Sequence, residues 1–419
     1  MLKNAPALLR QLFDRAVEVA DPMRTIAKHL PPKPAGRVVV IGAGKASARM
    51  AEAVEAAWGP CEGLVITRYG YGRPCEGIEI VEAAHPVPDQ AGFDATARIL
   101  NLLSGLGQND FVLALISGGA SALLVAPVDG VALSEKQAVN AALLASGAPI
   151  DRMNIVRKHL SRVKGGQLAA AAYPAPMLTL MISDVPGDDP AFIGSGPTVG
   201  DLSLPVEARA VIENWSIAVP VSVTAALLKP GRVIVPGDKR LSKVTNRIIA
   251  APAQSLEAAA ELARAQGCDV RILGDALEGE ARDIAKTQAE MALGIQANMK
   301  TGDRPVLLLS GGELTVTRRG SGVGGPNAEF MLAMAIALNG APLIHAIACD
   351  TDGVDGAAEV AGASIGPGSL ATARALKIDP GDYLDRNDAH RFFAAINSQI
   401  ITGPTLTNVN DFRAVLIEN

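Results

Sequence analysis

The chain has 419 residues and a formal net charge of −5, and this length predicts two domains rather than a single core. Hydrophobic residues make up 49% of the sequence and charged residues 19%, which excludes a disordered chain. The acidic balance and the lack of any Lys/Arg run argue against nucleic acid as a partner.

The first predicted element is an amphipathic helix near the N-terminus, in which Leu8, Leu9 and Leu12 recur at helical spacing. Charged residues lie between them, so the segment does not have the character of a signal peptide. The longest apolar runs, such as 111–116, are far short of the roughly 20 residues that cross a bilayer. The four cysteines form no CxxC pair, which excludes a structural zinc site of that type. We expect a soluble, cytoplasmic protein with no membrane partner.

Short apolar runs alternate with Gly-rich turns and helical patterns through the first half of the chain. This rhythm predicts a parallel sheet covered on both faces, hence the α/β class. The expected strands are 37–42, 63–68, 78–83, 111–119 and 177–184.

The second half repeats the α/β rhythm after a segment rich in Ala, Glu, Lys and Gln. We expect a first domain over 1–240, a connecting segment over 241–300 that contains a strand at 270–274, and a second α/β domain over 301–419. The expected elements of the second domain are strands at 305–313, 314–319 and 343–353, a helix at 328–340 and a final strand.

The first candidate site is the segment IGAGKASARM, residues 41–50, directly after the first strand. Gly42 and Gly44 allow a tight turn, and a following helix would point its amides at an anion near Lys45. The segment is not a Walker A loop. It partly matches a dinucleotide fingerprint, with Ser47 in place of the third Gly and Arg68 ending the next strand, so a dinucleotide site stays open.

The second candidate site is ISGGASALL, residues 116–124, where another strand runs into a Gly-rich turn. Such a loop could cradle a small carboxylate outside the carboxyl end of a strand. The residues expected to bind substrate are Ser117, Gly118, Gly119 and Ser121. Downstream, a run of Arg157, Lys158, His159, Arg162 and Lys164 is predicted on one helix, with a solvated face or a side that closes over an anionic substrate.

The third candidate site places Asp184, Asp188 and Asp189 on a Gly/Pro-rich turn after the strand at 177–184. Carboxylates in this position suit a magnesium–nucleotide complex or a general base. Asp residues also form ordinary turns, so the role of each one stays open. No histidine pair has metal-ligand spacing, no Ser-His-Asp signature occurs, and the metal ligands are therefore left unassigned. His85 precedes two prolines and either lines the cleft or, as we expect, has an ordinary loop role.

The second half contributes further Gly- and acid-rich loops at strand ends: SGGE (310–313), GVGGPNAE (322–329), DTDGVDG (350–356) and the polar segment 402–417. The spacing in DTDGVDG departs from that of an EF-hand calcium loop. We interpret these loops as lying near a nucleotide.

The chain contains, in order, the motifs GAGKAS, SGGxSALL, RKHLSRVKGGQLA, ISDVPGDDP with SGPT, GGPNAEF, DTDGxDG and TGPTxTNVND. This ordered set resembles the class II glycerate kinases, the glycerate 2-kinase family with a C-terminal MOFRL domain. The likeness runs from about residue 5 to residue 417. It implies a Rossmann-like N-terminal domain, a second α/β domain with the active site in the cleft between them, and ATP- and Mg²⁺-dependent conversion of D-glycerate to 2-phosphoglycerate. Similar members are labelled hydroxypyruvate reductases and linked to tartrate breakdown.

The resemblance also suggests roles for particular residues. Lys45 matches the family's cleft lysine, Asp188 or Asp189 and Glu313 match its candidate acids, and Asn408 matches a polar residue of its tail. One departure is Pro326, which stands where many members have arginine. The residues expected near the nucleotide are Gly42, Gly44, Gly312, Glu313, Gly325, Asn327, Asp352 and Asn408.

These assignments give a mechanistic hypothesis. Lys45 would neutralise the transferring phosphoryl group, an Asp of the 184–189 turn would orient or deprotonate the hydroxyl, and the 117–121 loop with Arg157 would hold the carboxylate. Two alternatives stay open: an NAD(P)H-dependent reductase, and a non-catalytic binding protein for which Pro326 is the only support. A homodimer is left open as well.

Overall fold

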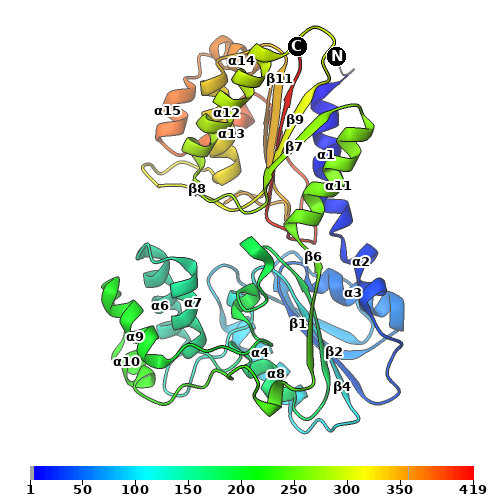
Figure 1. Cartoon of the computed structure of the whole chain (residues 1–419). Helices are drawn as coiled ribbons and strands as arrows, with labels where there is room; N and C mark the ends of the chain where they lie inside the picture. The colour runs from blue at the N-terminus through cyan, green and yellow to red at the C-terminus, as the bar shows by residue number, and fades with distance from the viewer. Residues whose placement is uncertain (1–3, 357) are drawn as a thin grey trace. The chain divides into compact units, whose positions relative to one another are not determined.

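The computed structural model describes residues 4–356 and 358–419, which form two compact units (Figure 1). The N-terminal unit comprises residues 22–184 and 188–249. The C-terminal unit comprises the residues up to Asp21, the short stretch 185–187 and residues 250–419. The α/β class with two units, each built on a sheet, confirms the fold predicted from the sequence.

The N-terminal unit is built on a six-stranded sheet with the strand order β3-β2-β1-β4-β5-β6. Neighbouring strands from β3 to β5 pair in parallel. Every residue of β1 and of β5 is buried, as expected for strands covered on both faces. The strands are β1 Val38–Ala43, β2 Glu62–Arg68, β3 Ile78–Ala83, β4 Phe111–Ile116, β5 Met177–Ile182 and β6 Val244–Ala250.

Helices surround this sheet, and four of them, α6, α7, α9 and α10, form a group with its own apolar core that includes Val139, Val156 and Val223 (Figure 1). The helices are α2 Pro22–His29, α3 Ser47–Trp58, α4 Gln90–Leu103, α5 Ala120–Leu123, α6 Leu133–Ala145, α7 Ile150–His159, α8 Gln167–Ala172, α9 Pro205–Asn214 and α10 Val221–Leu227, with 3₁₀ turns η2 Ile193–Ser195 and η3 Lys239–Leu241. A further 3₁₀ turn, η1 Pro186–Asp188, includes residues that belong to the C-terminal unit.

The C-terminal unit contains a mixed sheet of order β13-β12-β11-β14-β9-β7. Within the described residues, β7 and β9 pair in parallel, and the other neighbouring strands of this sheet pair antiparallel. A second sheet joins β10 to β8. The strands are β7 Asp269–Gly274, β8 Gly279–Glu280, β9 Val306–Ser310, β10 Leu314–Thr315, β11 Ile344–Asp350, β12 Gly362–Ile365, β13 Gln399–Ile400 and β14 Asp411–Ile417. Its helices are α1 Ala5–Val19, α11 Pro252–Ala265, α12 Ala281–Asn298, α13 Pro326–Leu338, α14 Ser369–Ala375, α15 Pro380–Asp385 and α16 Ala389–Ala395.

The amphipathic helix α1 packs within the C-terminal unit, although it begins the chain. Figure 1 shows α1 (blue) beside α11 (green) against the sheet. The buried side chains Leu9, Leu12 and Phe13 share one core with Leu256 of α11 and Phe412 of β14. The structure thus divides the chain differently from the predicted ranges 1–240, 241–300 and 301–419, because the apolar face of α1 is covered by the second sheet.

Two local predictions were wrong. The basic run from Arg157 to Lys164 does not lie on one helix, because α7 ends at His159 and the chain turns before α8. Nor is it a solvated face, since Lys158 and Lys164 are buried. The strand predicted over 314–319 is limited to Leu314–Thr315, and the following residues form a loop.

Candidate active site

The loops that follow β1 and β4 meet where the strand order of the N-terminal sheet reverses. In the order β3-β2-β1-β4-β5, the chain progresses outward in opposite directions from the adjacent strands β1 and β4. Open parallel sheets bind ligands at this topological switch point, outside the carboxyl ends of the strands. The GAGK turn and the SGG loop therefore occupy the position where a ligand is expected.

These two loops are joined to each other by hydrogen bonds. The Lys45 amide donates to the Gly118 carbonyl at 2.8 Å, and the Ala46 amide donates to the Ser117 hydroxyl at 3.0 Å. A Cβ at Gly44, where φ is +142°, would lie 2.0 Å from Ser117 Oγ, and one at Gly42 would lie 2.5 Å from the Leu115 carbonyl oxygen. The two glycines are thus required by close packing, and the fully buried Ser117 hydroxyl joins the loops together.

The side chains of Lys45 and His85 border the SGG loop. A Cβ at Gly119 would stand 3.3 Å from Lys45 Cγ and 3.2 Å from His85 Cδ2. Of the two roles considered for His85, this position beside the SGG loop agrees with the one that was not preferred. The available signal was its place two residues after β3, because the carboxyl ends of parallel strands share one edge of the sheet.

A chain of polar contacts connects the SGG loop with α7. The Ser121 and Ser195 hydroxyls lie 2.7 Å apart, and Ser195 donates to Asn154 Oδ1 at 3.1 Å. The same Oδ1 atom accepts a long bond, 3.5 Å, from Arg157 Nη1. The predicted substrate residues Ser121 and Arg157 are therefore linked through two residues, Asn154 and Ser195, that the sequence did not single out.

Among the three acidic residues after β5, Asp188 has the most unusual environment. Its φ is +55°, and its buried Oδ1 atom has no hydrogen-bond partner. A left-handed backbone at a non-glycine residue costs on the order of 1–3 kcal/mol and is found preferentially at functional sites. Asp189 is exposed, and its Oδ1 atom accepts a bond from the Ala191 amide at 2.8 Å. Asp184 lies two residues after the end of β5.

An unfilled carboxylate oxygen on Asp188 fits the oxygen donors that Mg²⁺ prefers. Within residues 4–356 and 358–419, no three side chains of His, Cys, Asp or Glu gather into a metal-binding group. Proteins commonly hold this ion through one or two carboxylates and the phosphates of a nucleotide. The carboxylate of Asp188 is thus a chemically suitable donor for such an ion.

In the C-terminal unit, an internal carboxylate occupies the N-terminus of α13. Asp355 accepts hydrogen bonds from the Asn327 and Ala328 amides at 2.9 and 2.8 Å. Gly325 precedes the helix, and a Cβ there would lie 2.4 Å from Asp355 Cγ. Pro326 is in the first turn of α13, where the lack of an amide proton costs no helical hydrogen bond. The structure thus gives Pro326 a local role in starting the helix.

A buried pair connects α13 with the SGGE turn. Asp411 Oδ1 accepts from Asn327 Nδ2 at 2.6 Å, and Arg413 Nη2 donates to Asp411 Oδ2 at 2.5 Å and to the Gly312 carbonyl at 2.6 Å. Burial raises the pKa of Asp411 to about 6, although Arg413 and Asn327 act in the opposite direction. Gly312 and Asn327, which are far apart in the sequence, are therefore held in one network.

The remaining residues predicted near the nucleotide lie on neighbouring loops of the same unit. Asp352 Oδ1 accepts from the Val354 amide at 2.8 Å, and Asn408 Oδ1 accepts from the Asn410 amide at 3.3 Å. Their loops follow β11 and precede β14, two strands whose register pairs Asp350 with Asp411. Glu313 is exposed. The structure therefore places Asp352 and Asn408 near one sheet edge.

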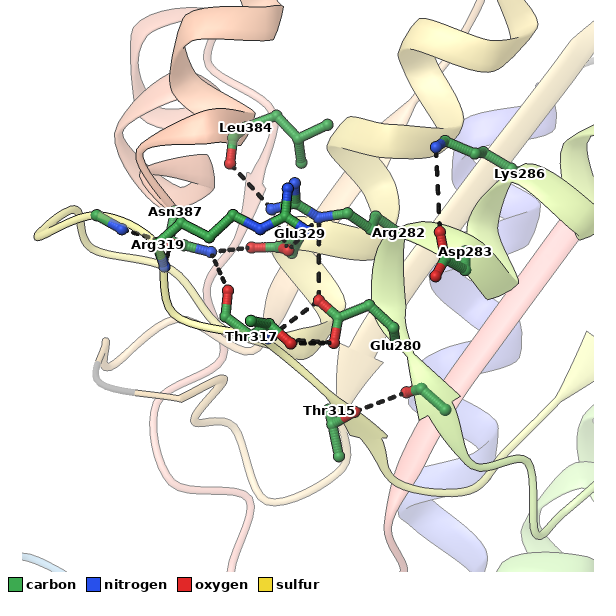
Figure 2. A network of polar contacts seen from close by, with 12 residues as sticks. Glu280, Arg282, Asp283, Lys286, Thr315, Thr317, Arg319, Glu329, Leu384 and Asn387 are labelled. Atoms are coloured by element: carbon green, nitrogen blue, oxygen red, sulfur yellow. Dashed lines mark hydrogen bonds and ion pairs between the residues drawn. The ribbon is translucent and has the colours of Figure 1, made fainter. Parts of the chain in front are cut away.

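The acidic residue of the GGPNAE segment, Glu329, has a structural role. Arg282 donates to Glu329 Oε1 at 2.7 Å and to the Leu384 carbonyl at 3.2 Å, as Figure 2 shows. Asn387 donates to Glu329 Oε2 at 2.9 Å and accepts a bond from the Arg319 amide at 2.6 Å. Since Glu329 is only 1% exposed, this network fixes the loop before α13.

Comparison with known proteins places the chain in a family. Residues 8–228 match a domain of unknown function, DUF4147, and residues 306–411 match the MOFRL family. The D-glycerate 2-kinase of Thermotoga maritima is 37% identical over 97% of both chains. A "Putative hydroxypyruvate reductase" of Agrobacterium vitis is 50% identical over 99% of this chain and 95% of its own length. This chain belongs to the glycerate kinase family that combines DUF4147 with MOFRL.

A solved structure supports the same relationship. The crystal structure of glycerate kinase from Thermotoga maritima matches with a TM-score of 0.86 at 36% identity, over 98% of this chain and 99% of that one. In the part of this chain that the structure describes, no helix is both long and apolar enough to cross a bilayer.

Proposed function

We propose that this protein is a glycerate kinase that transfers the γ-phosphoryl group of ATP to the 2-hydroxyl of D-glycerate. The observation that carries the proposal is the position of Lys45 and the SGG loop at the switch point of the parallel sheet. Relatives that match over nearly their whole length are named glycerate 2-kinases in Thermotoga maritima and Pyrococcus horikoshii, at 37% and 34% identity.

Phosphoryl transfer requires positioning and charge neutralisation rather than a covalent intermediate. Lys45 would neutralise charge on the transferring group. The SGG loop, with Arg157, would hold the carboxylate of glycerate. Asp184, Asp188 or Asp189 would orient or deprotonate the accepting hydroxyl.

The nucleotide would be held by the Gly- and acid-rich loops, including those of Gly312, Glu313, Asp352 and Asn408. The chemistry that Mg²⁺ would supply when bound is neutralisation of negative charge on the phosphates. Asp188 is the residue we expect to face the ion, because its buried oxygen has no hydrogen-bond donor in the protein.

The alternative is an NAD(P)H-dependent hydroxypyruvate reductase, favoured by two Agrobacterium vitis relatives with that name at 50% identity. A dinucleotide would place its pyrophosphate on the amides that follow β1. Here the Lys45 amide bonds to the Gly118 carbonyl and the Ala46 amide bonds to Ser117 Oγ. Because protein atoms use these two donors, the geometry favours the kinase.

Parallel assays of the purified protein test the choice. One contains D-glycerate, ATP and Mg²⁺ and follows ADP and phosphoglycerate; the other contains hydroxypyruvate with NADH or NADPH and follows absorbance. We expect ADP formation that depends on both glycerate and Mg²⁺, with phosphate on the 2-position. Nicotinamide oxidation without ADP formation would overturn the proposal in favour of the reductase.

A further inference from the structure

Three cations gather beside the SGG loop: Lys136 on α6, Arg157 on α7 and Lys164 in the turn before α8. Lys136 is 2% exposed and Lys164 is 1% exposed, while Arg157 is partly exposed. Across the residues that the structure describes, none of the three forms an ion pair with a carboxylate.

Their hydrogen-bond partners are all neutral. Lys136 Nζ donates to the Arg157 carbonyl at 3.4 Å, and Lys164 Nζ donates to the Ser121 and Leu124 carbonyls at 2.9 and 3.2 Å. Arg157 Nη1 has only the long bond to Asn154 Oδ1. An ammonium has three donors and a guanidinium has five. Several N–H groups of the cluster are therefore available to a ligand.

Such an arrangement is unfavourable for the fold alone, because a buried charge without a counter-charge carries a large desolvation cost. Burial, and next the charge of Arg157, lower the pKa of Lys136 to about 7. Burial, and next the charges of Lys136 and Arg157, hold the pKa of Lys164 well below its usual value. The neighbouring Lys158, by contrast, forms a 2.5 Å ion pair with Asp201.

The cluster is connected to the loop that is expected to receive the substrate. Lys164 bonds to the carbonyl of Ser121, and the hydroxyl of Ser121 continues through Ser195 and Asn154 to Arg157.

We propose that Lys136, Arg157 and Lys164 form a binding subsite for an oxyanion group, either the carboxylate or the phosphoryl group of the substrate or product. The bound anion supplies the counter-charge that the protein lacks, and the partly exposed Arg157 is the member that it contacts first. Only the identification of the substrate as glycerate rests on the proposed function; the anion subsite itself does not.

Isothermal titration calorimetry of the full-length protein tests this subsite with three probes: sodium D-glycerate, inorganic phosphate and uncharged glycerol. The variants are Lys136→Gln and Lys164→Gln, and the matched control is Arg152→Gln, an exposed cation on α7. We expect each lysine variant to weaken anion binding roughly ten- to a hundredfold, as for the loss of a charged hydrogen bond, and the control to leave it unchanged. Lys136→Met and Arg157→Lys replace any variant that does not fold.

Proton uptake provides a second measurement. At pH 8, a bound anion should raise the pKa of Lys136, so titrations in buffers of different ionisation enthalpy should reveal proton uptake by the parent that Lys136→Gln loses.

The outcomes of the binding titrations distinguish the possible ligands. Lysine-dependent binding of glycerate identifies the carboxylate, and lysine-dependent binding of phosphate alone identifies the phosphoryl group. Lysine-dependent phosphate binding without glycerate kinase activity would reject the proposed function and retain the subsite. If the folded lysine variants bind anions as the parent does, or if the parent binds none, the proposed subsite is overturned.

Discussion

In the C-terminal unit, buried cations meet carboxylates: Arg282 lies 2.7 Å from Glu329, and Arg413 lies 2.5 Å from Asp411. In the N-terminal unit, Lys136 and Lys164 are buried to the same degree but bond only to carbonyl oxygens. Both kinds of site carry a desolvation cost, and only the paired kind offsets it within the protein. The difference suggests that paired charges hold the C-terminal loops in place, whereas unpaired charges await a ligand.

The largest expected effect concerns catalysis at the switch point. Lys45→Ala should lower kcat/KM for glycerate phosphorylation by about 10²–10³, because a preorganised charge that stabilises the transition state is lost. Steady-state kinetics check this, with Lys28→Ala, an exposed lysine of α2, as the control. Activity of Lys45→Ala within a few-fold of the parent would remove this residue from the mechanism.

The next largest effect is expected for the buried ion pair between Arg282 and Glu329. Glu329→Ala should destabilise the C-terminal unit by about 3–5 kcal/mol, since the buried Arg282 would keep only the longer ion pair with Glu280, at 3.9 Å. Both tryptophans, Trp58 and Trp215, lie in the N-terminal unit, so urea unfolding followed by circular dichroism, compared with tryptophan fluorescence, distinguishes the two units. The double variant with Arg282→Met should recover part of the loss; an unchanged transition in Glu329→Ala would contradict a structural role for the pair.

A smaller effect of opposite sign, a gain of stability, is expected when the buried, unpaired Lys136 is replaced. Lys136→Met should stabilise the ligand-free N-terminal unit at pH 7 by at most about 1–4 kcal/mol, the range seen when well-packed apolar side chains replace buried ion pairs. Its matched control is Lys158→Met, which should destabilise because it leaves Asp201 without its partner. Tryptophan fluorescence in urea measures both. Equal destabilisation by the two substitutions would mean that Lys136 contributes to the fold as Lys158 does.

The smallest effect concerns an exposed pair. Glu79→Gln removes the ion pair between Glu79 and Arg98, whose two side chains are 52% and 51% exposed, respectively. This substitution should change the free energy of unfolding by less than about 1 kcal/mol. The same urea titration measures it. A loss of unfolding free energy as large as that caused by Glu329→Ala would show that burial does not determine how much an ion pair stabilises this protein.

The sequence predicted the sheet of the N-terminal unit well, because strands such as Val38–Ala43 and Met177–Ile182 are apolar throughout and end in Gly- or Asp-containing turns. It could not assign helix α1 to the second unit. An amphipathic face containing Leu9 and Leu12 shows that a helix is buried, but it does not show which sheet covers it.

Part of the candidate site could likewise be predicted from the sequence. Lys45 and Ser117 lie in strand-to-helix turns, where sequence position alone indicates an edge of the sheet. Lys136 has no such signal, because a lysine in LSEKQAVNAALLA is typical of a solvated helix face, and only packing within the helical group buries it. Asp355 was likewise missed, since its partners, the amides of Asn327 and Ala328, lie almost 30 residues away in the sequence.

The most direct test of the central contrast is the pH dependence of stability without ligand, in the parent and in Lys136→Met. Between about pH 7 and the usual lysine pKa of 10.5, the unfolded chain binds the Lys136 proton more often than the folded chain does, so stability should rise with pH. Urea titrations at pH 7, 8 and 9 should give the parent a slope steeper than that of Lys136→Met by on the order of 1 kcal/mol per pH unit, and D-glycerate should reduce this difference. Identical slopes in the two proteins would contradict a Lys136 pKa that is lowered by burial without a counter-charge.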